Sequence, residues 1–373
     1  MSKYLKMLLS ILAVTVLLNI LAFSKGFCDF YTDYVYVHIA NGYGWVMDLI
    51  PFPVGEILMY LGIILLFFAA VFGISYLFLK KKPKGRLFIK KYMKTMVFVG
   101  MVMLFLYTVL WFVPFRGRSI EAKLDQGHTY TTKELIRCRA YVVNQINDIA
   151  KKVDRDKKGH MIYPEDVEAL CKNALAGIAG EYPRLRGHYP TMKKAYCSDF
   201  LEWMYIGGYT YPYTMEITNN RYITKMYYPT LYLHEMAHHK GYYKESDANF
   251  ISFLAGSSSE DLFLQYAAYL DMYYYLDDAY VSYLLEKDSE ELWEEGRKQP
   301  ALSELVENDI SETDEEAEEV YQESVNPVLE ENVSSYAEEV SEVGWETQAE
   351  ILDEFNYDGV VRFALEYYDG ILY

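Results

Sequence analysis

The chain has 373 residues, which is long enough for more than one folded unit, and a formal net charge of −18. This acidic balance argues against nucleic-acid binding, which needs a basic face. Hydrophobic residues make up 52% of the chain, and much of this content lies in three long apolar runs, so a lipid bilayer is an expected partner.

The three apolar runs predict membrane-spanning helices at about residues 4–23, 57–79 and 93–115. A cleaved signal peptide is the alternative for the first run, but the run lacks a clear cleavage site and approaches spanning length. The connection between the second and third runs is strongly basic, whereas the first connection carries only Lys25. The positive-inside rule therefore places the N-terminus inside and everything after the third run outside.

The outer part begins with helical patterns. Apolar residues recur at a helical period over residues 133–152, and a second helix is expected over residues 164–178. Residues 210–218 are rich in Tyr, Thr and Ile, with prolines and glycines nearby, which predicts an edge strand.

The most specific pattern is H-E-x-x-H within residues 228–241, formed by His234, Glu235 and His238. Pro229 and Gly241 suit the start and the end of one short helix. His234 and His238 are four residues apart, so their imidazoles project from one helix face and can bind one zinc ion. Glu235 is the candidate general base, acting on the water that the metal activates.

So short a motif also arises by chance, so its context matters. A metzincin would need a histidine where Lys244 stands. Glu245 instead opens a second helical pattern, and E-x-x-A-N (Glu245 to Asn249) resembles an element of gluzincin peptidases. By this resemblance Glu245 is the third zinc ligand, and Asn249 orients a ligand histidine. Asp247 is the alternative third ligand.

The zincin resemblance also implies that the edge strand before the zinc helix pairs with an extended substrate. Thr214 and Glu216 are then candidate substrate-binding residues, although a structural carboxylate capping a loop is the alternative for Glu216. A long helix is expected over residues 260–285. On it, Tyr266 or Tyr269 is a candidate phenol donor to the oxyanion, with ordinary packing as the alternative.

The last part of the chain is acidic. Residues 287–354 are expected to be helical in places and partly disordered. Residues 357–373 regain apolar side chains, which predicts a helix that packs back on the outer domain.

Three segments resemble a bacterial membrane-protein family catalogued as domain of unknown function thirty-eight-ten. They are I-P-F-x-x-G-E-I-L at residues 50–58, P-Y-T-x-E-x-x-N at residues 212–219, and the zinc segment with its helix at residues 234–250. The family looks like zinc metallopeptidases, and the resemblance implies Zn²⁺ as cofactor without indicating a substrate.

The predicted fold is therefore mainly α. Residues 1–118 form an anchor of three transmembrane helices, residues 119–286 a zincin-like, mostly helical extracytoplasmic domain with a small β element, and residues 287–373 an acidic extension. The expected function is zinc-dependent hydrolysis of peptide or protein substrates on the outer face of the cytoplasmic membrane. Two alternatives remain: a non-catalytic sensor, whose structural zinc would take a fourth ligand such as His239 or Asp247, and an intramembrane protease.

Overall fold

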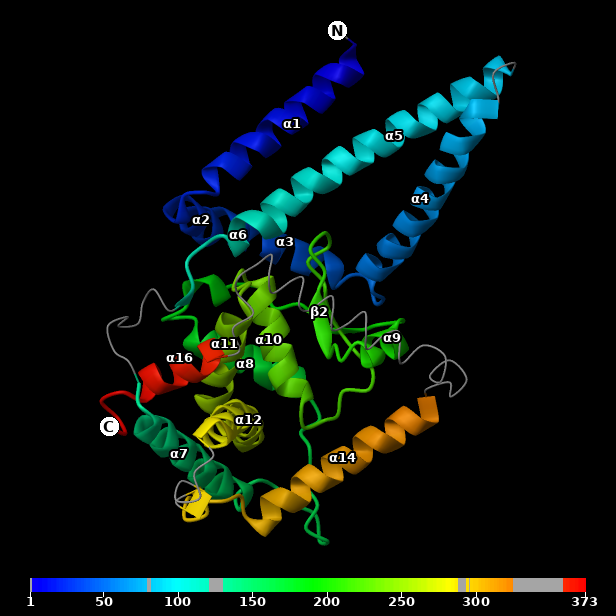
Figure 1. Cartoon of the computed structure of the whole chain (residues 1–373). Coiled ribbons are helices and arrows are strands. Elements are labelled where there is room, and N and C mark those ends of the chain that lie inside the picture. The colour runs from blue at the N-terminus through cyan, green and yellow to red at the C-terminus, as the bar shows by residue number, and fades with distance from the viewer. Residues whose placement is uncertain (1, 79–81, 121–129, 288–292, 295, 325–357) are drawn as a thin grey trace. The chain divides into compact units, whose positions relative to one another are not determined.

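The protein was analysed as a computed structural model that describes residues 2–78, 82–120, 130–287, 293–294, 296–324 and 358–373 (Figure 1). The chain divides into two compact units. The first unit contains Met1–Arg118 and also Thr210–Glu216, and the second contains Ser119–Tyr209 and Ile217–Tyr373. The chain therefore passes from one unit to the other three times, which the sequence did not predict.

The first unit contains three helices that are long and apolar enough to cross a membrane, as the three apolar runs predict. They are α1 (Lys3–Leu21), α4 (Val54–Phe78) and α5 (Pro83–Tyr107), which continues through η2 (Thr108–Phe112) into α6 (Val113–Phe115) (Figure 1). The third helix begins at Pro83 rather than near residue 93. Proline suits the first helical position, and the basic residues that follow it are good helix formers.

The connection between the first two spans is also helical. It consists of α2 (Lys25–Tyr31), η1 (Thr32–Tyr36) and α3 (Val37–Met47). The hydroxyl of Tyr31 donates to the Val109 carbonyl at 2.9 Å, and Tyr36 is fully buried. This connection therefore packs as part of the first unit.

Residues 210–216 cap the first turn of α4 within the same unit. The Glu216 carboxylate accepts hydrogen bonds from the backbone N–H groups of Val54 (3.0 Å) and Gly55 (2.6 Å). These N–H groups have no partner within the helix, so the carboxylate acts as a helix cap. The ring of Tyr211 lies so close to Gly55 that a Cβ atom there would be 2.5 Å from its Cδ1 atom. Two of the segments that carry the family resemblance thus meet in space.

The second unit is mostly helical, and the predicted helices are present. The principal ones are α7 (Thr132–Ala150), α8 (Val167–Ile178), α10 (Tyr228–His239), α11 (Glu245–Ser257), α12 (Leu262–Lys287), α14 (Glu304–Ser324) and α16 (Asp358–Tyr368), with the short η4 (Pro183–Leu185) and α9 (Ser198–Trp203) between them. Helix α7 begins with a capping box formed by Thr131 and Glu134. Helix α8 begins later than predicted because Asp166 is its cap and accepts from the Ala169 N–H.

Helices α10, α11 and α12 pack against one another around a shared apolar core (Figure 1). Gly256 of α11 allows the close approach of α12, because a Cβ atom there would be 2.6 Å from the Cβ of Ala268. The side chains of Tyr232, Phe250 and Phe253 are almost fully buried in the same core. The helix that carries the H-E-x-x-H motif is therefore held by a packed core along its length.

A small sheet accompanies these helices, with strand order β1-β3-β2. The strands are β1 (Lys193–Lys194), β2 (Gly208–Thr210) and β3 (Ile217–Asn219), and β1 and β3 pair in parallel with Lys193 opposite Thr218. The prediction of one edge strand over residues 210–218 was wrong. The chain turns within this stretch, closed by the Tyr211 N–H on the Glu216 carbonyl (2.8 Å), and Met215 adopts a positive φ of 57°.

Part of the acidic extension is an ordered element of the second unit. In α14, the Asp309 carboxylate is 4% exposed and accepts two hydrogen bonds from Arg155, both 2.7 Å, and one from the Tyr266 hydroxyl at 2.8 Å. Helix α16 packs on α11, with the rings of Phe250 and Phe363 5.4 Å apart. The stretch between α14 and α16, where a partly disordered connection was predicted, lies outside the described residues.

The buried pair of Arg155 and Asp309 predicts a large effect on stability. Asp309→Ala leaves the Arg155 guanidinium buried without its carboxylate and is expected to lower the free energy of unfolding by about 3–5 kcal/mol. The measurement is denaturation of the full-length protein in detergent. Asp148→Ala is the control, because its ion pair with Lys151 is exposed, and it should change stability by less than about 0.5 kcal/mol. Similar losses in both variants would contradict the role of the buried pair.

Candidate metal centre

Helix α10 and the turn after it bring the motif residues to the start of α11. Pro229 lies in the first turn of α10, and the helix ends at His239. Gly241 has a φ of 91°, a left-handed conformation that glycine adopts without strain and that reverses the chain. Glu245 is the first residue of α11 and so faces back toward α10, as the sequence predicts.

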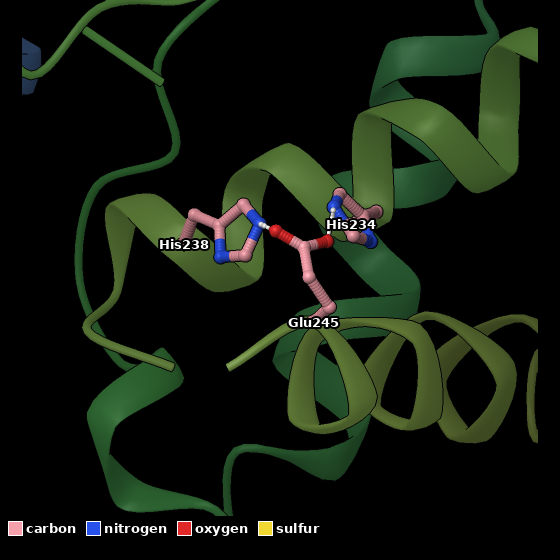
Figure 2. A group of neighbouring side chains, drawn as sticks. All are labelled: His234, His238 and Glu245. Carbon is pink, nitrogen blue, oxygen red and sulfur yellow. Dashed lines mark ion pairs between the residues drawn. The ribbon is translucent and has the colours of Figure 1, made fainter. Parts of the chain in front are cut away.

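The side chains of His234, His238 and Glu245 converge on one point (Figure 2). His234 Nε2 is 3.2 Å from Glu245 Oε2, and His238 Nε2 is 3.5 Å from Glu245 Oε1. The potential ligand atoms of the three residues all lie within 4.8 Å of one another. Among the described residues, no further His, Cys, Asp or Glu joins this group.

The other ring nitrogen of each histidine is engaged by an oxygen atom. His234 Nδ1 is 2.6 Å from Asn249 Oδ1, and His238 Nδ1 is 2.8 Å from the carbonyl oxygen of Tyr242. Since both oxygens accept hydrogen bonds, each Nδ1 carries a proton, and Nε2 of each ring is directed toward Glu245. The structure therefore places the Asn249 side chain against His234, where an amide that orients a ligand histidine is expected.

Three electron-pair donors that face one another repel unless a cation lies among them. A proton can take the part of this cation. Burial lowers the pKa of His238, but the Glu245 carboxylate outweighs burial and raises it to about 9. Burial raises the pKa of Glu245, yet the two histidines hold it well below its ordinary value. A divalent cation bound here would displace this proton, so its affinity should fall as the pH falls.

The geometry and the donor types fit zinc. Ligand atoms at about 2.05 Å from a tetrahedral ion are about 3.3 Å apart, close to the observed 3.2 and 3.5 Å. Two imidazoles and one carboxylate are a common set for a catalytic zinc ion. The alternative ligand, Asp247, is engaged elsewhere, because its carboxylate accepts from the Ser119 hydroxyl and from the Ile120 N–H at 3.3 Å.

Glu235 lies next to the first ligand on α10, and its side chain is almost fully buried. Strand β2 passes directly beside it. A Cβ atom at Gly208 would be 3.3 Å from Glu235 Oε1 and 2.9 Å from the carbonyl oxygen of Thr218. Glycine at this position therefore allows the strand to run close to the carboxylate.

The structure places the other predicted site residues in packing or capping contacts. The Tyr266 hydroxyl donates to Asp309, and the ring of Tyr269 packs edge-on against Phe253 at 5.6 Å. The Thr214 hydroxyl donates to Glu216 at 2.6 Å, and Glu216 caps α4. These contacts match the alternatives considered from the sequence, which were packing for the tyrosines and a capping carboxylate for Glu216.

Sequence reasoning missed several groups at the site. The Tyr242 carbonyl orients His238, but a backbone group has no signature in residue types. The ring of Tyr243 is stacked on that of His238, with centroids 6.2 Å apart. Asp271 of α12 interacts electrostatically with His234, while its own burial raises its pKa to about 6. It lies far along the chain from the motif, and only the packing of α12 on α10 brings it near.

Residues 31–338 match the model of one sequence family, described as a protein of unknown function (DUF3810). No curated protein and no solved structure matches the chain. These comparisons identify a family without indicating an activity, so the function must be argued from the site.

The hydrogen bond from His234 to Asn249 can be tested by metal affinity. Asn249→Ala removes the acceptor that orients the imidazole, and the affinity for zinc is expected to fall about 10- to 100-fold. The measurement is competition with a chromophoric chelator on detergent-purified protein. Asn147→Ala is the control, because its amide bonds to Ala301 and Ser303, away from the three ligands. Equal affinities in both variants would refute the orienting role of Asn249.

Proposed function

This chain belongs to a family of proteins of unknown function (DUF3810), and we propose that it is a membrane-anchored zinc metallopeptidase. The observation that carries the proposal is the convergence of His234, His238 and Glu245, with both imidazole Nε2 atoms turned toward the same carboxylate. A buried carboxylate, Glu235, lies beside this group on the same helix. Together these residues are the set that hydrolysis at a single zinc ion requires.

The number of ligands supports a catalytic rather than a structural zinc ion. Catalytic sites use three protein ligands and keep one position open for water and substrate, whereas structural sites are closed by four. In the described part of the chain, only three residues meet at the centre, and neither His239 nor Asp247 belongs to the group. This arrangement argues against the sensor with a structural zinc ion.

Each residue of the site has a distinct part in the proposed reaction. A zinc ion held by the three ligands supplies Lewis acidity that activates water at neutral pH. Glu235 accepts the proton of the attacking water and passes it to the leaving amine. Asn249 and the Tyr242 carbonyl keep the imidazoles in the tautomer that the metal needs.

The sheet supports a peptide as the substrate. Strand β2 is at one edge of the sheet, and its Gly208 lies against Glu235. An extended peptide that adds to this edge would bring its backbone carbonyls alongside the general base. Peptide-bond hydrolysis is therefore the reaction class that the site supports best.

The first experiment compares zinc content and turnover in four full-length proteins. Wild type and Glu235→Gln are expected to hold about one zinc ion per chain, whereas Glu245→Ala should lose it. Turnover of a fluorogenic peptide library should fall about 10²- to 10⁴-fold in Glu235→Gln, because the general base is lost. Glu312→Gln, an exposed substitution on α14, is the control. Full activity of Glu235→Gln, or wild-type protein without zinc after metal-replete growth, would refute the proposal.

We propose further that the second unit faces the outside of the cytoplasmic membrane and that the N-terminus is inside. The basic residues between α4 and α5 support this orientation. The motif helix α10 is not among the three candidate spans, which argues against an intramembrane protease.

The orientation predicts which cysteines react in intact cells. A membrane-impermeant maleimide should label Lys298→Cys without permeabilisation, because this exposed position belongs to the second unit. Lys84→Cys, an exposed position in the first turn of α5, should react only after permeabilisation. The wild-type chain measures the background from its four native cysteines. The reverse pattern of labelling would overturn the orientation.

A further inference from the structure

Asp271 of α12 is a carboxylate near the metal centre that the proposed reaction does not use. Tyr274 follows it by three residues and so lies on the same side of the helix. The Tyr227 hydroxyl, from the residue that immediately precedes α10, donates to the Tyr274 hydroxyl at 3.2 Å. One turn beyond Asp271, this side of α12 therefore meets the start of α10.

The same side of α12 also comes close to α10 one turn before Asp271. Ala268 precedes Asp271 by three residues. A Cβ atom at Gly256 would be 2.6 Å from the Cβ of Ala268 and 3.7 Å from Cδ1 of Leu233, so both side chains approach the same point of α11. Leu233 is the residue before the ligand His234. Asp271 thus lies between two places where α12 approaches α10, and its electrostatic interaction with His234 agrees with this position.

The Asp271 carboxylate has no hydrogen bond and no ion pair within the described part of the chain. The protein encloses it closely enough for burial to raise its pKa to about 6, yet the residue is still partly exposed, so a ligand can reach it. Enclosing a carboxylate without a partner opposes folding. Such groups are concentrated at functional sites, where a ligand supplies the partner.

The surroundings of Asp271 suit a cation. The rings of Tyr227 and Tyr274 have their centroids 6.4 Å apart, and they offer aromatic faces to a positive group one turn away from the carboxylate. Among the residues that the structure describes, no Lys or Arg side chain pairs with Asp271. The complementary group is therefore one that a peptide can bring, namely an amine or a guanidinium.

We propose that Asp271 is a specificity-determining residue that binds a cationic group of the peptide substrate, either its terminal amine or a Lys or Arg side chain near the scissile bond. This inference rests on the proposed peptidase function and extends it by naming a substrate class. Asp271 is not one of the three converging ligands, so its charge is free to act on the substrate. A cation held there keeps the neighbouring peptide bond beside the metal centre.

The test compares wild type, Asp271→Asn and Asp278→Asn as full-length proteins. Asparagine keeps the size of the side chain and removes its charge. Asp278 is an exposed carboxylate two turns further along α12, so Asp278→Asn is the matched control for the same change of charge on the same helix. The probes are pairs of fluorogenic peptides. One pair has lysine or norleucine beside the scissile bond, and the other has a free or an acetylated terminal amine.

Wild type and Asp278→Asn should cleave the cationic member of at least one pair about 10- to 100-fold better, measured as kcat/KM, and Asp271→Asn should lose this preference. The pair that shows the preference identifies the source of the cation. Zinc content should be the same in all three proteins. The inference is overturned if wild type has no preference, if Asp271→Asn keeps it, or if Asp271→Asn cleaves charged and uncharged peptides worse by the same factor.

Binding separates this inference from the proposed function. In Glu235→Gln, the Kd of the cationic peptide should be lower than that of its uncharged partner, and adding Asp271→Asn should remove the difference. A protein that binds in this way while wild type cleaves no peptide would refute the peptidase function and support the cation site. Equal affinities for both peptides would overturn the cation site.

Stability provides a check that the substitution acts through the substrate. The melting temperature of Asp271→Asn should equal or exceed that of wild type, because the substitution removes an enclosed charge without a partner. A clearly lower melting temperature would show that Asp271 has a structural partner in the folded protein, and it would overturn the inference.

Discussion

The organisation of the second unit depends on the meeting of three electron-pair donors at one point. Two imidazole nitrogens and a carboxylate face one another at 3.2 and 3.5 Å, and the repulsion between their lone pairs is relieved by a proton or by a bound cation. The surrounding elements maintain it. Helix α10 sets the spacing of the histidines, Gly241 reverses the chain, and α11 supplies both Glu245 and the amide that orients His234. The dense packing of α12 on these two helices keeps the donors from relaxing apart.

The second notable feature is the path of the chain between the two units. A segment of seven residues, grouped with the first unit, caps the long apolar helix α4 through a buried carboxylate. Placing a carboxylate at a helix N-terminus is favourable, because unpaired N–H groups and the helix dipole are both present there. Two glycines allow separate close contacts near this segment, since Gly55 gives room to the Tyr211 ring within the first unit and Gly208 gives room to Glu235 within the second.

The acidic extension also contributes to the fold. Asp309 brings α14 against the second unit through Arg155 and Tyr266, so a part of the chain that is rich in negative charge is anchored by one buried ion pair. The remaining acidic side chains of α14 lie mostly toward solvent or pair at its edge, as Glu316 does with Lys225. Tyr266, which the sequence offered as a catalytic candidate, donates its hydroxyl to Asp309 and so helps to hold α14 in place.

Local patterns were sufficient for much of this protein. Apolar runs predicted three helices that are long and apolar enough to cross a membrane, and helical periodicity with its caps predicted α7, α8 and α12, because these signals depend on residues close together in the chain. The spacing of His234 and His238 predicted one shared helix face for the same reason. The expected gluzincin-like E-x-x-A-N element pointed to Glu245 and Asn249, and the structure places both against His234. The positions of Tyr266 and Glu216 were decided by partners far away in the sequence, Asp309 and the first turn of α4. The roles of the Tyr242 carbonyl and of Gly208 could be recognised only in the tertiary structure. Every residue has a backbone oxygen, and a glycine allows a close approach only if another group lies next to it, so the residue type alone predicts neither contact.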